Sequence, residues 1–126
     1  MSVTVVDASA IAAVVFEEPE AGPLVAAVRG RLLAPSLIRY ELANLCLAKL
    51  RRAPADAVVT LKRYRLLRDL DLRTTEPDWD ALPELAGHWS LSAYDAAYLE
   101  VALRERLPLV TLDARLAKVY QRVKRT

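Results

Sequence analysis

The sequence predicts an α/β fold, a three-layer α/β/α sandwich with a central parallel sheet of four to five strands. Short apolar or β-branched runs alternate with helical patterns along the whole chain of 126 residues. The first run, residues 3–6, is apolar on both faces, which is typical of a central strand covered by helices. No linker or repeat interrupts the pattern, so we expect one domain over residues 1–126 with the first strand central.

Four runs have the length and composition of buried strands. They cover residues 3–6, 32–34, 70–74 and 109–111. The first ends at Asp7 and the last runs into Asp113, so each places a carboxylate where a strand gives way to a helix. Residues 123–126 leave room only for a marginal fifth strand.

Helical patterns fill the intervals between these strands. They cover residues 8–16, 24–29, 37–52, 54–69, 79–88, 92–104 and 114–122. Pro19 and Gly30 end the first two, and Pro54 suits the first turn of the fourth. Ser36 and Ser92 are the expected N-caps of the third and sixth. Because the third helix is apolar nearly all round, we expect it to be largely buried.

The composition excludes several classes of chemistry. One histidine, His88, and one cysteine, Cys46, rule out a histidine pair for acid–base cleavage of RNA and a His/Cys zinc cluster. The net charge of +2 permits a nucleic-acid partner without requiring one. The longest apolar run, residues 8–16, is far shorter than the ~20 residues that span a bilayer. We therefore expect a cytoplasmic protein without membrane contact, whose chemistry depends on carboxylates.

Four acidic residues are candidates for a common site. In an open parallel sheet, ligands bind beyond the carboxyl ends of the strands where the strand order reverses. Asp7 and Asp113 lie at that reversal if the first strand stands between the second and the fourth. Glu41 and Asp95 interrupt apolar helices and have no basic residue four positions later, so the simplest solution is that they reach the same pocket.

Four neighbouring carboxylates repel one another unless cations neutralise them. A site built only from oxygen ligands selects hard cations, which predicts Mg²⁺ or Mn²⁺ and favours phosphodiester hydrolysis. Ser9, Asn44 and Thr111 lie close to these acids in the sequence and are candidate supporting partners.

Each acid also has a structural explanation. Asp7 and Asp113 could simply cap the helices that follow them, and Asp95 with Ser92 resembles a capping box. Glu41 could pair with an arginine from another helix. These explanations are individually reasonable, but they are weaker together because all four acids interrupt apolar surroundings.

Basic and aromatic residues could contact a nucleic acid. The candidates for phosphate contacts are Arg51, Arg52, Lys62, Arg63, Arg115 and Lys118. Solvated helix faces or dimer rims are equally good explanations for each of them. Tyr94 and Tyr98 could stack on bases, but core packing is the favoured interpretation for both.

At these acids the chain resembles PIN-domain proteins, and more closely the toxin nucleases of the VapBC toxin–antitoxin type. Short motifs that contain the four acids carry the resemblance, in this order: Val6-Asp-Ala-Ser-Ala10, Tyr40-Glu-Leu-Ala-Asn44, Leu91-Ser-Ala-Tyr-Asp-Ala-Ala-Tyr-Leu99 and Thr111-Leu-Asp-Ala-Arg-Leu116. Each motif is weak alone, but the four in this order are fairly specific.

The resemblance implies a five-stranded parallel sheet and metal-dependent ribonuclease activity. By position, Asp7, Glu41, Asp95 and Asp113 would be the acidic metal-site residues, with Ser9 supporting Asp7. It also implies a homodimer inhibited by a cognate antitoxin whose C-terminal segment occupies the active-site groove. The resulting hypothesis is a Mg²⁺- or Mn²⁺-dependent endoribonuclease toxin; the alternative is a non-catalytic PIN-like module that binds RNA or protein.

Overall fold

The fold is built on one parallel sheet. The computed structural model describes residues 2–125 and contains four strands in the order β3-β2-β1-β4. They are β1 (Val3–Val6), β2 (Arg31–Pro35), β3 (Asp71–Thr75) and β4 (Leu109–Val110). This order confirms the predicted α/β class and the central position of the first strand, since β1 pairs in parallel with both β2 and β4.

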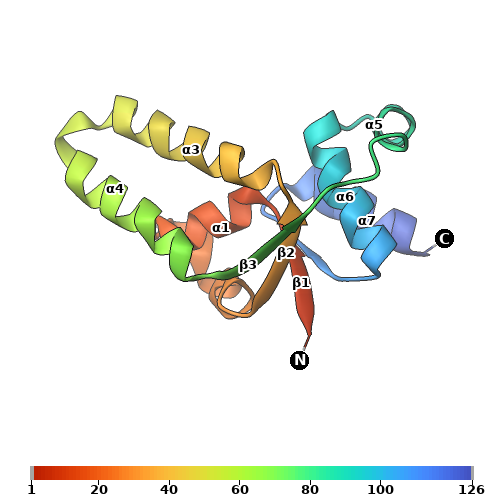
Figure 1. Cartoon of the computed structure of the whole chain (residues 1–126), viewed down its shortest axis with the longest axis horizontal. Helices are drawn as coiled ribbons and strands as arrows, with labels where there is room; N and C mark the ends of the chain where they lie inside the picture. Colours follow the sequence, from red (N-terminus) through yellow and green to blue (C-terminus); the bar gives the residue numbers. More distant parts are fainter. Residues whose placement is uncertain (1, 126) are drawn as a thin grey trace.

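Helices cover both faces of the sheet (Figure 1). They are α1 (Ala8–Val15), α2 (Val25–Val28), α3 (Ile38–Arg52), α4 (Ala57–Arg65), α5 (Leu82–Trp89), α6 (Ala93–Glu105) and α7 (Ala114–Arg125). Short 3₁₀ turns adjoin them at η1 (Pro19–Leu24), η2 (Pro54–Asp56) and η3 (Leu66–Asp69). α1, α3 and α4 lie on one side of the sheet, and α5, α6 and α7 lie on the other.

The core forms where both helical layers meet β1. Val5 and Val6 are fully buried, as are Ile11 of α1 and Leu99 of α6. Burial of such apolar side chains is the main favourable contribution to folding. Because β1 and β4 are adjacent and parallel, their carboxyl ends open at the same edge of the sheet.

The prediction that the third helix is largely buried is wrong. Only one stripe of α3 is buried, namely Ile38, Leu42 and Cys46, while Tyr40 and Leu47 are 77% and 39% exposed. The reason is that α3 and α4 form an antiparallel hairpin that extends beyond the sheet (Figure 1), so the body of the protein covers only one face of α3.

Ion pairs fasten this hairpin to the turn that follows α1. Lys49 of α3 pairs with Glu18 and lies over the ring of Phe16, 5.1 Å from its centroid. Arg63 of α4 pairs with Glu17 at 2.6 Å and donates to the carbonyl oxygen of Phe16. The same turn therefore holds both helices of the hairpin.

Two other expectations from the sequence need correction. Ser36 does not cap α3, whose N-cap is Leu37; instead the Ser36 hydroxyl donates to Glu76 Oε1 at 2.6 Å. The residues suggested for a marginal fifth strand are helical up to Arg125, so the described part of the sheet has four strands, and Thr126 lies outside the described residues. Helix continues here because Val123 extends the apolar stripe of α7 that packs on the core.

None of the helices within residues 2–125 is both long enough and apolar enough to cross a bilayer.

The docking of α7 can be tested by truncating Leu116, which is fully buried. We expect Leu116→Ala to lower the free energy of unfolding by about 2–5 kcal/mol, because it leaves a cavity between α7 and the core. Leu66→Ala, at a side chain that is 50% exposed, should change it by no more than about 0.5 kcal/mol. Urea denaturation of both variants gives the comparison, and equal effects would contradict the packing described here.

Candidate active site

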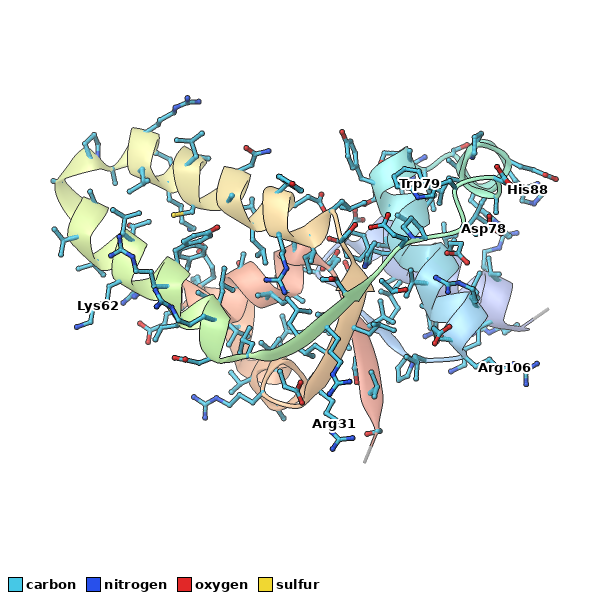
Figure 2. The ribbon with its side chains drawn as sticks, viewed as in Figure 1. Arg31, Lys62, Asp78, Trp79, His88 and Arg106 are labelled. Atoms are coloured by element: carbon cyan, nitrogen blue, oxygen red, sulfur yellow. The ribbon has the colours of Figure 1, made fainter. Side chains whose placement is uncertain are left out.

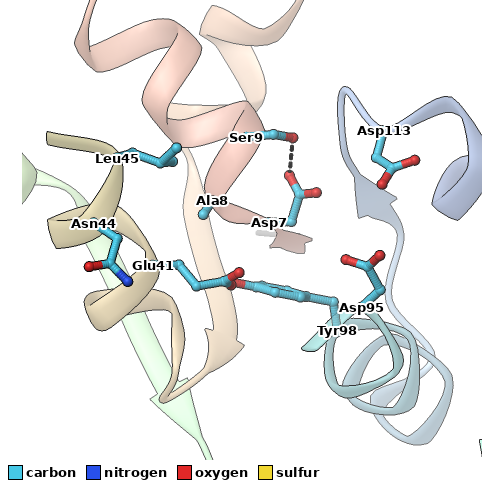
Figure 3. A pocket seen from close by; sticks show the side chains of 9 residues that line it. All are labelled: Asp7, Ala8, Ser9, Glu41, Asn44, Leu45, Asp95, Tyr98 and Asp113. Carbon is cyan, nitrogen blue, oxygen red and sulfur yellow. Dashed lines mark hydrogen bonds between the residues drawn. The ribbon is translucent and has the colours of Figure 1, made fainter. Parts of the chain in front are cut away.

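The predicted acids line one pocket of about 380 Å³ at the carboxyl ends of β1 and β4. Asp7 follows β1, Asp113 precedes α7, and Glu41 and Asp95 lie in the first turns of α3 and α6. The remaining lining residues are Ala8, Ser9, Asn44, Leu45 and Tyr98. Figure 3 shows side chains from the α3 and α6 sides of the pocket facing Asp7 and Asp113 across a common opening.

Asp7 is the most constrained of the acids and is 6% exposed. Its Oδ1 accepts hydrogen bonds from Ser9 Oγ at 2.7 Å and from the backbone N–H of Ala10 at 3.1 Å. Its Oδ2 accepts a hydrogen bond from Thr111 Oγ1. Asp7 therefore caps α1, and two of the three predicted supporting residues, Ser9 and Thr111, contact it, while the third, Asn44, lines the pocket.

The same hydroxyl groups connect the ends of β1 and β4. Ser9 Oγ accepts from the backbone N–H of Leu112 at 3.1 Å, and Thr111 Oγ1 accepts from that of Asp113 at 2.9 Å. Asp113 in turn caps α7, since its Oδ1 accepts from the N–H groups of Arg115 and Leu116 at 2.9 and 3.2 Å. Asp113 nonetheless remains exposed at the rim of the pocket.

Asp95 is half-buried on the opposite side of the pocket. Its backbone N–H donates to Ser92 Oγ at 3.1 Å, which confirms Ser92 as the N-cap of α6. Burial raises the pKa of the Asp95 carboxyl, and the negative charges of Asp113 and Asp7 raise it further, while Arg115 acts in the opposite direction. These acids are therefore close enough to influence one another's ionisation.

Glu41 Oε1 accepts a hydrogen bond from the Tyr98 hydroxyl at 2.5 Å. The sequence left open an ion pair between Glu41 and an arginine of another helix, but the partner in the structure is this neutral tyrosine. Burial raises the pKa of Glu41, the charges of Asp7 and Asp95 add to this effect, and the hydrogen bond from Tyr98 opposes it. Both helix-borne acids are thus held in surroundings that disfavour their charged forms.

Tyr98 is a site residue that the sequence analysis missed. It was assigned to core packing, and its side chain is indeed 1% exposed, but its hydroxyl reaches the pocket. A signal was available, because Tyr98 lies three residues after Asp95 and so shares its helix face. The same assignment was wrong for Tyr94, which is 62% exposed.

The basic candidates lie in different surroundings. Arg115 is exposed, its charge acts on Asp95, and its guanidinium donates to the carbonyl oxygen of Ser90. Arg63 is engaged by Glu17 at the far end of α1. The remaining candidates are all exposed, namely Arg51, Arg52, Lys62 and Lys118, and Figure 2 shows Lys62 pointing outward from α4. Arg115 is thus the one among these six whose charge acts on a pocket acid.

The donor set fits a hard divalent cation that keeps part of its hydration shell. Every acidic group in the pocket offers oxygen, the ligand atom that Mg²⁺ and Mn²⁺ prefer. Within residues 2–125, no three His, Cys, Asp or Glu side chains are grouped so that they could hold a metal ion between them. Mg²⁺ is normally held by only one or two carboxylates together with water, so an open arrangement of this kind suits it.

Comparisons with known proteins agree with this fold. The crystal structure of PAE2754 from Pyrobaculum aerophilum is similar over 100% of this chain and 97% of that chain, with a TM-score of 0.73 and 22% sequence identity. No curated protein sequence matches the chain. The family model that describes the PIN domain matches residues 4–122. The chain therefore belongs to the PIN-domain family.

Proposed function

We propose that this PIN-domain protein is a Mg²⁺- or Mn²⁺-dependent endoribonuclease and the toxin of a VapBC-type toxin–antitoxin pair. PIN domains are typically metal-dependent nucleases. The observation that carries the proposal is the pocket itself, in which Asp7, Glu41, Asp95 and Asp113 come together from four separate segments of the chain. Helix capping accounts for the positions of Asp7 and Asp113, but it does not explain why Glu41 and Asp95 line the same pocket.

The electrostatics of the pocket support the need for a cation. Glu41 and Asp95 both have raised pKa values because burial and neighbouring carboxylates disfavour their ionised forms. A divalent cation would remove this penalty by offsetting several negative charges at once. When bound, the cation supplies an acidified water molecule as nucleophile and neutralises charge on the phosphoryl group.

The protein's own residues contribute orientation. Ser9, Thr111 and the first turn of α1 fix both oxygens of Asp7, so this carboxylate needs little reorganisation on binding a ligand. Asp113 caps α7 and Asp95 lies in the first turn of α6, and both line the same pocket as Asp7. Arg115, exposed and near Asp95, is suited to contact an RNA phosphate beside the scissile bond.

We also propose a homodimer and a cognate antitoxin as partners. This part of the proposal rests on the resemblance to VapBC toxins, and exposed apolar side chains on the α3–α4 hairpin give it some physical support. These side chains are Tyr40, Leu45, Leu47, Val58 and Val59. Exposed apolar side chains on an element that extends from the body of a protein are candidates for protein–protein contacts.

A non-catalytic module that binds RNA or protein is the alternative function. It has no need for several carboxylates in one pocket, where their mutual repulsion costs stability and would disfavour an approaching phosphate. The presence of all four acids in one pocket therefore favours the nuclease.

The nuclease proposal predicts that cleavage requires both the metal and the acids. We expect EDTA to abolish cleavage of a structured RNA and added Mg²⁺ or Mn²⁺ to restore it. Asp7→Asn and Asp95→Asn should each reduce the rate by at least the roughly 10–100-fold that is typical for residues supporting a metal site. Asp69→Asn, at an exposed acid in η3, is the matched control. Cleavage that persists in EDTA, or in both variants, would refute the proposal.

The raised pKa values predict how stability depends on pH in the absence of metal. Folding raises the pKa of Glu41 and Asp95 above their ordinary values of 4.5 and 3.8, so between these ordinary values and the raised ones the folded state binds more protons than the unfolded state. These groups therefore stabilise the metal-free fold at low pH, and the contribution is lost as pH rises through the raised values. We expect Mg²⁺ to restore stability at neutral pH.

Asp95→Asn isolates this effect. The variant should melt a few degrees above the wild type in EDTA at neutral pH, and it should lose most of the additional stabilisation that Mg²⁺ gives the wild type. Thermal melts at several pH values, with and without Mg²⁺, provide the measurement, and Asp69→Asn again serves as control. Equal stabilisation of wild type and Asp95→Asn by Mg²⁺ would argue against a metal at this pocket.

A further inference from the structure

We propose that Tyr98 is a positioning residue of the acidic pocket, which orients the Glu41 carboxylate through a hydrogen bond that joins α6 to the base of the α3–α4 hairpin. The inference rests on the proposed role of Glu41 in metal binding and extends it to a residue outside the acidic set. Its basis is the contact between the Tyr98 hydroxyl and Glu41 Oε1 at 2.5 Å, made by residues 57 positions apart in the sequence.

The surroundings of Tyr98 make it a rigid donor. Its side chain is 1% exposed and lies in the main apolar core with Leu99 and Val101 of the same helix. A close-packed ring cannot change rotamer without opening a cavity, so the position of its hydroxyl is fixed by the core. Glu41, in contrast, is a flexible side chain at the pocket wall, and fixing it otherwise costs conformational entropy.

The position of Glu41 makes such a contact necessary. Glu41 lies in the first turn of α3, and only a narrow stripe of this helix is buried against the rest of the protein. The other end of α3 is held by the ion pair between Lys49 and Glu18. The bond from Tyr98 fixes the pocket end of α3 to α6, the helix that also carries Asp95. Figure 3 shows the tyrosine ring reaching across the pocket floor to Glu41. Two of the acids are thereby placed relative to each other through one side chain.

The chemistry of the donor matters as well. A lysine or arginine at this position would orient Glu41 but would also neutralise the charge that attracts a cation. The neutral hydroxyl of tyrosine engages one carboxylate oxygen and leaves the full negative charge on the group. This arrangement is the one expected for a partner that orients a metal-binding carboxylate.

A second buried tyrosine provides a matched control for the experiment. Tyr120 is 6% exposed, and its hydroxyl donates to the carbonyl oxygen of Leu107 at 2.8 Å, at residues that do not line the acidic pocket. Tyr98→Phe and Tyr120→Phe each remove one buried hydroxyl and the hydrogen bond that it donates, and Tyr98→Phe also removes a contact with the backbone of Ala8. A loss of affinity that arises from destabilisation alone should appear in both variants.

The test is the dissociation constant for Mn²⁺, measured by isothermal titration calorimetry on the full chain. We expect Tyr98→Phe to weaken Mn²⁺ binding by about 10–100-fold. Tyr120→Phe should leave the Mn²⁺ dissociation constant within about twofold of the wild-type value, although it should lower the melting temperature by about as much as Tyr98→Phe does. In a double-mutant cycle, Tyr98→Phe should have little further effect on affinity in the Glu41→Gln background, because its partner charge is already absent.

Each outcome decides the proposal. Equal affinities for Tyr98→Phe and the wild type, equal losses in both tyrosine variants, or additive losses with Glu41→Gln would overturn it. A wild-type chain that binds no Mn²⁺ overturns it together with the proposed metal dependence. If the wild type binds Mn²⁺ and Tyr98→Phe weakens binding, but no RNA is cleaved, the positioning role stands and the ribonuclease proposal fails.

Discussion

The repulsion between carboxylates at one edge of the sheet is the constraint on which the rest of this structure depends. The strand order places β1 beside β4, so Asp7 and Asp113 follow neighbouring strand ends. α3 and α6 add Glu41 and Asp95 from the two sides. Ionised groups this close together are unfavourable without positive charge, and the surrounding structure lowers this cost by hydrogen bonding and not by pairing with basic side chains.

Neutral donors dominate the contacts of these acids. Hydroxyl groups of Ser9, Thr111 and Tyr98 and backbone N–H groups contact Asp7, Glu41 and Asp113. Basic side chains form ion pairs outside the pocket. Lys49 and Arg63 fasten the α3–α4 hairpin, and Arg104 pairs with the buried Glu100 at 3.0 Å. This separation keeps the pocket negative, as a cation site requires, while ion pairs stabilise the arrangement of the helices around it.

The sequence could predict the parallel sheet from the alternation of strands and helices. It could predict that the acids meet only on the assumption that the first strand lies between the second and the fourth, an order that the pattern supports without requiring it. It could not predict the exposure of α3, because an apolar helix is buried only on the faces that other elements cover, and Tyr40 and Leu47 lie on faces that the body leaves open. The role of Tyr98 was hidden for a related reason. A tyrosine in an apolar helix fits the core by its ring, and only the fold determines where its hydroxyl lies.

Asp7 and Asp113 could be explained either as helix caps or as acids of a metal site, and the two explanations are compatible. In a parallel α/β fold each strand ends where a helix begins, so the residue at this point is both the natural N-cap and the natural occupant of the ligand-binding edge. The N–H groups that Asp7 and Asp113 accept from belong to α1 and α7, and the partial positive charge of these helix ends favours a carboxylate there. Capping therefore reduces the cost of holding negative charge at the pocket. Burial and neighbouring carboxylates raise the pKa values of Glu41 and Asp95, so a bound cation would favour the ionised forms of both groups.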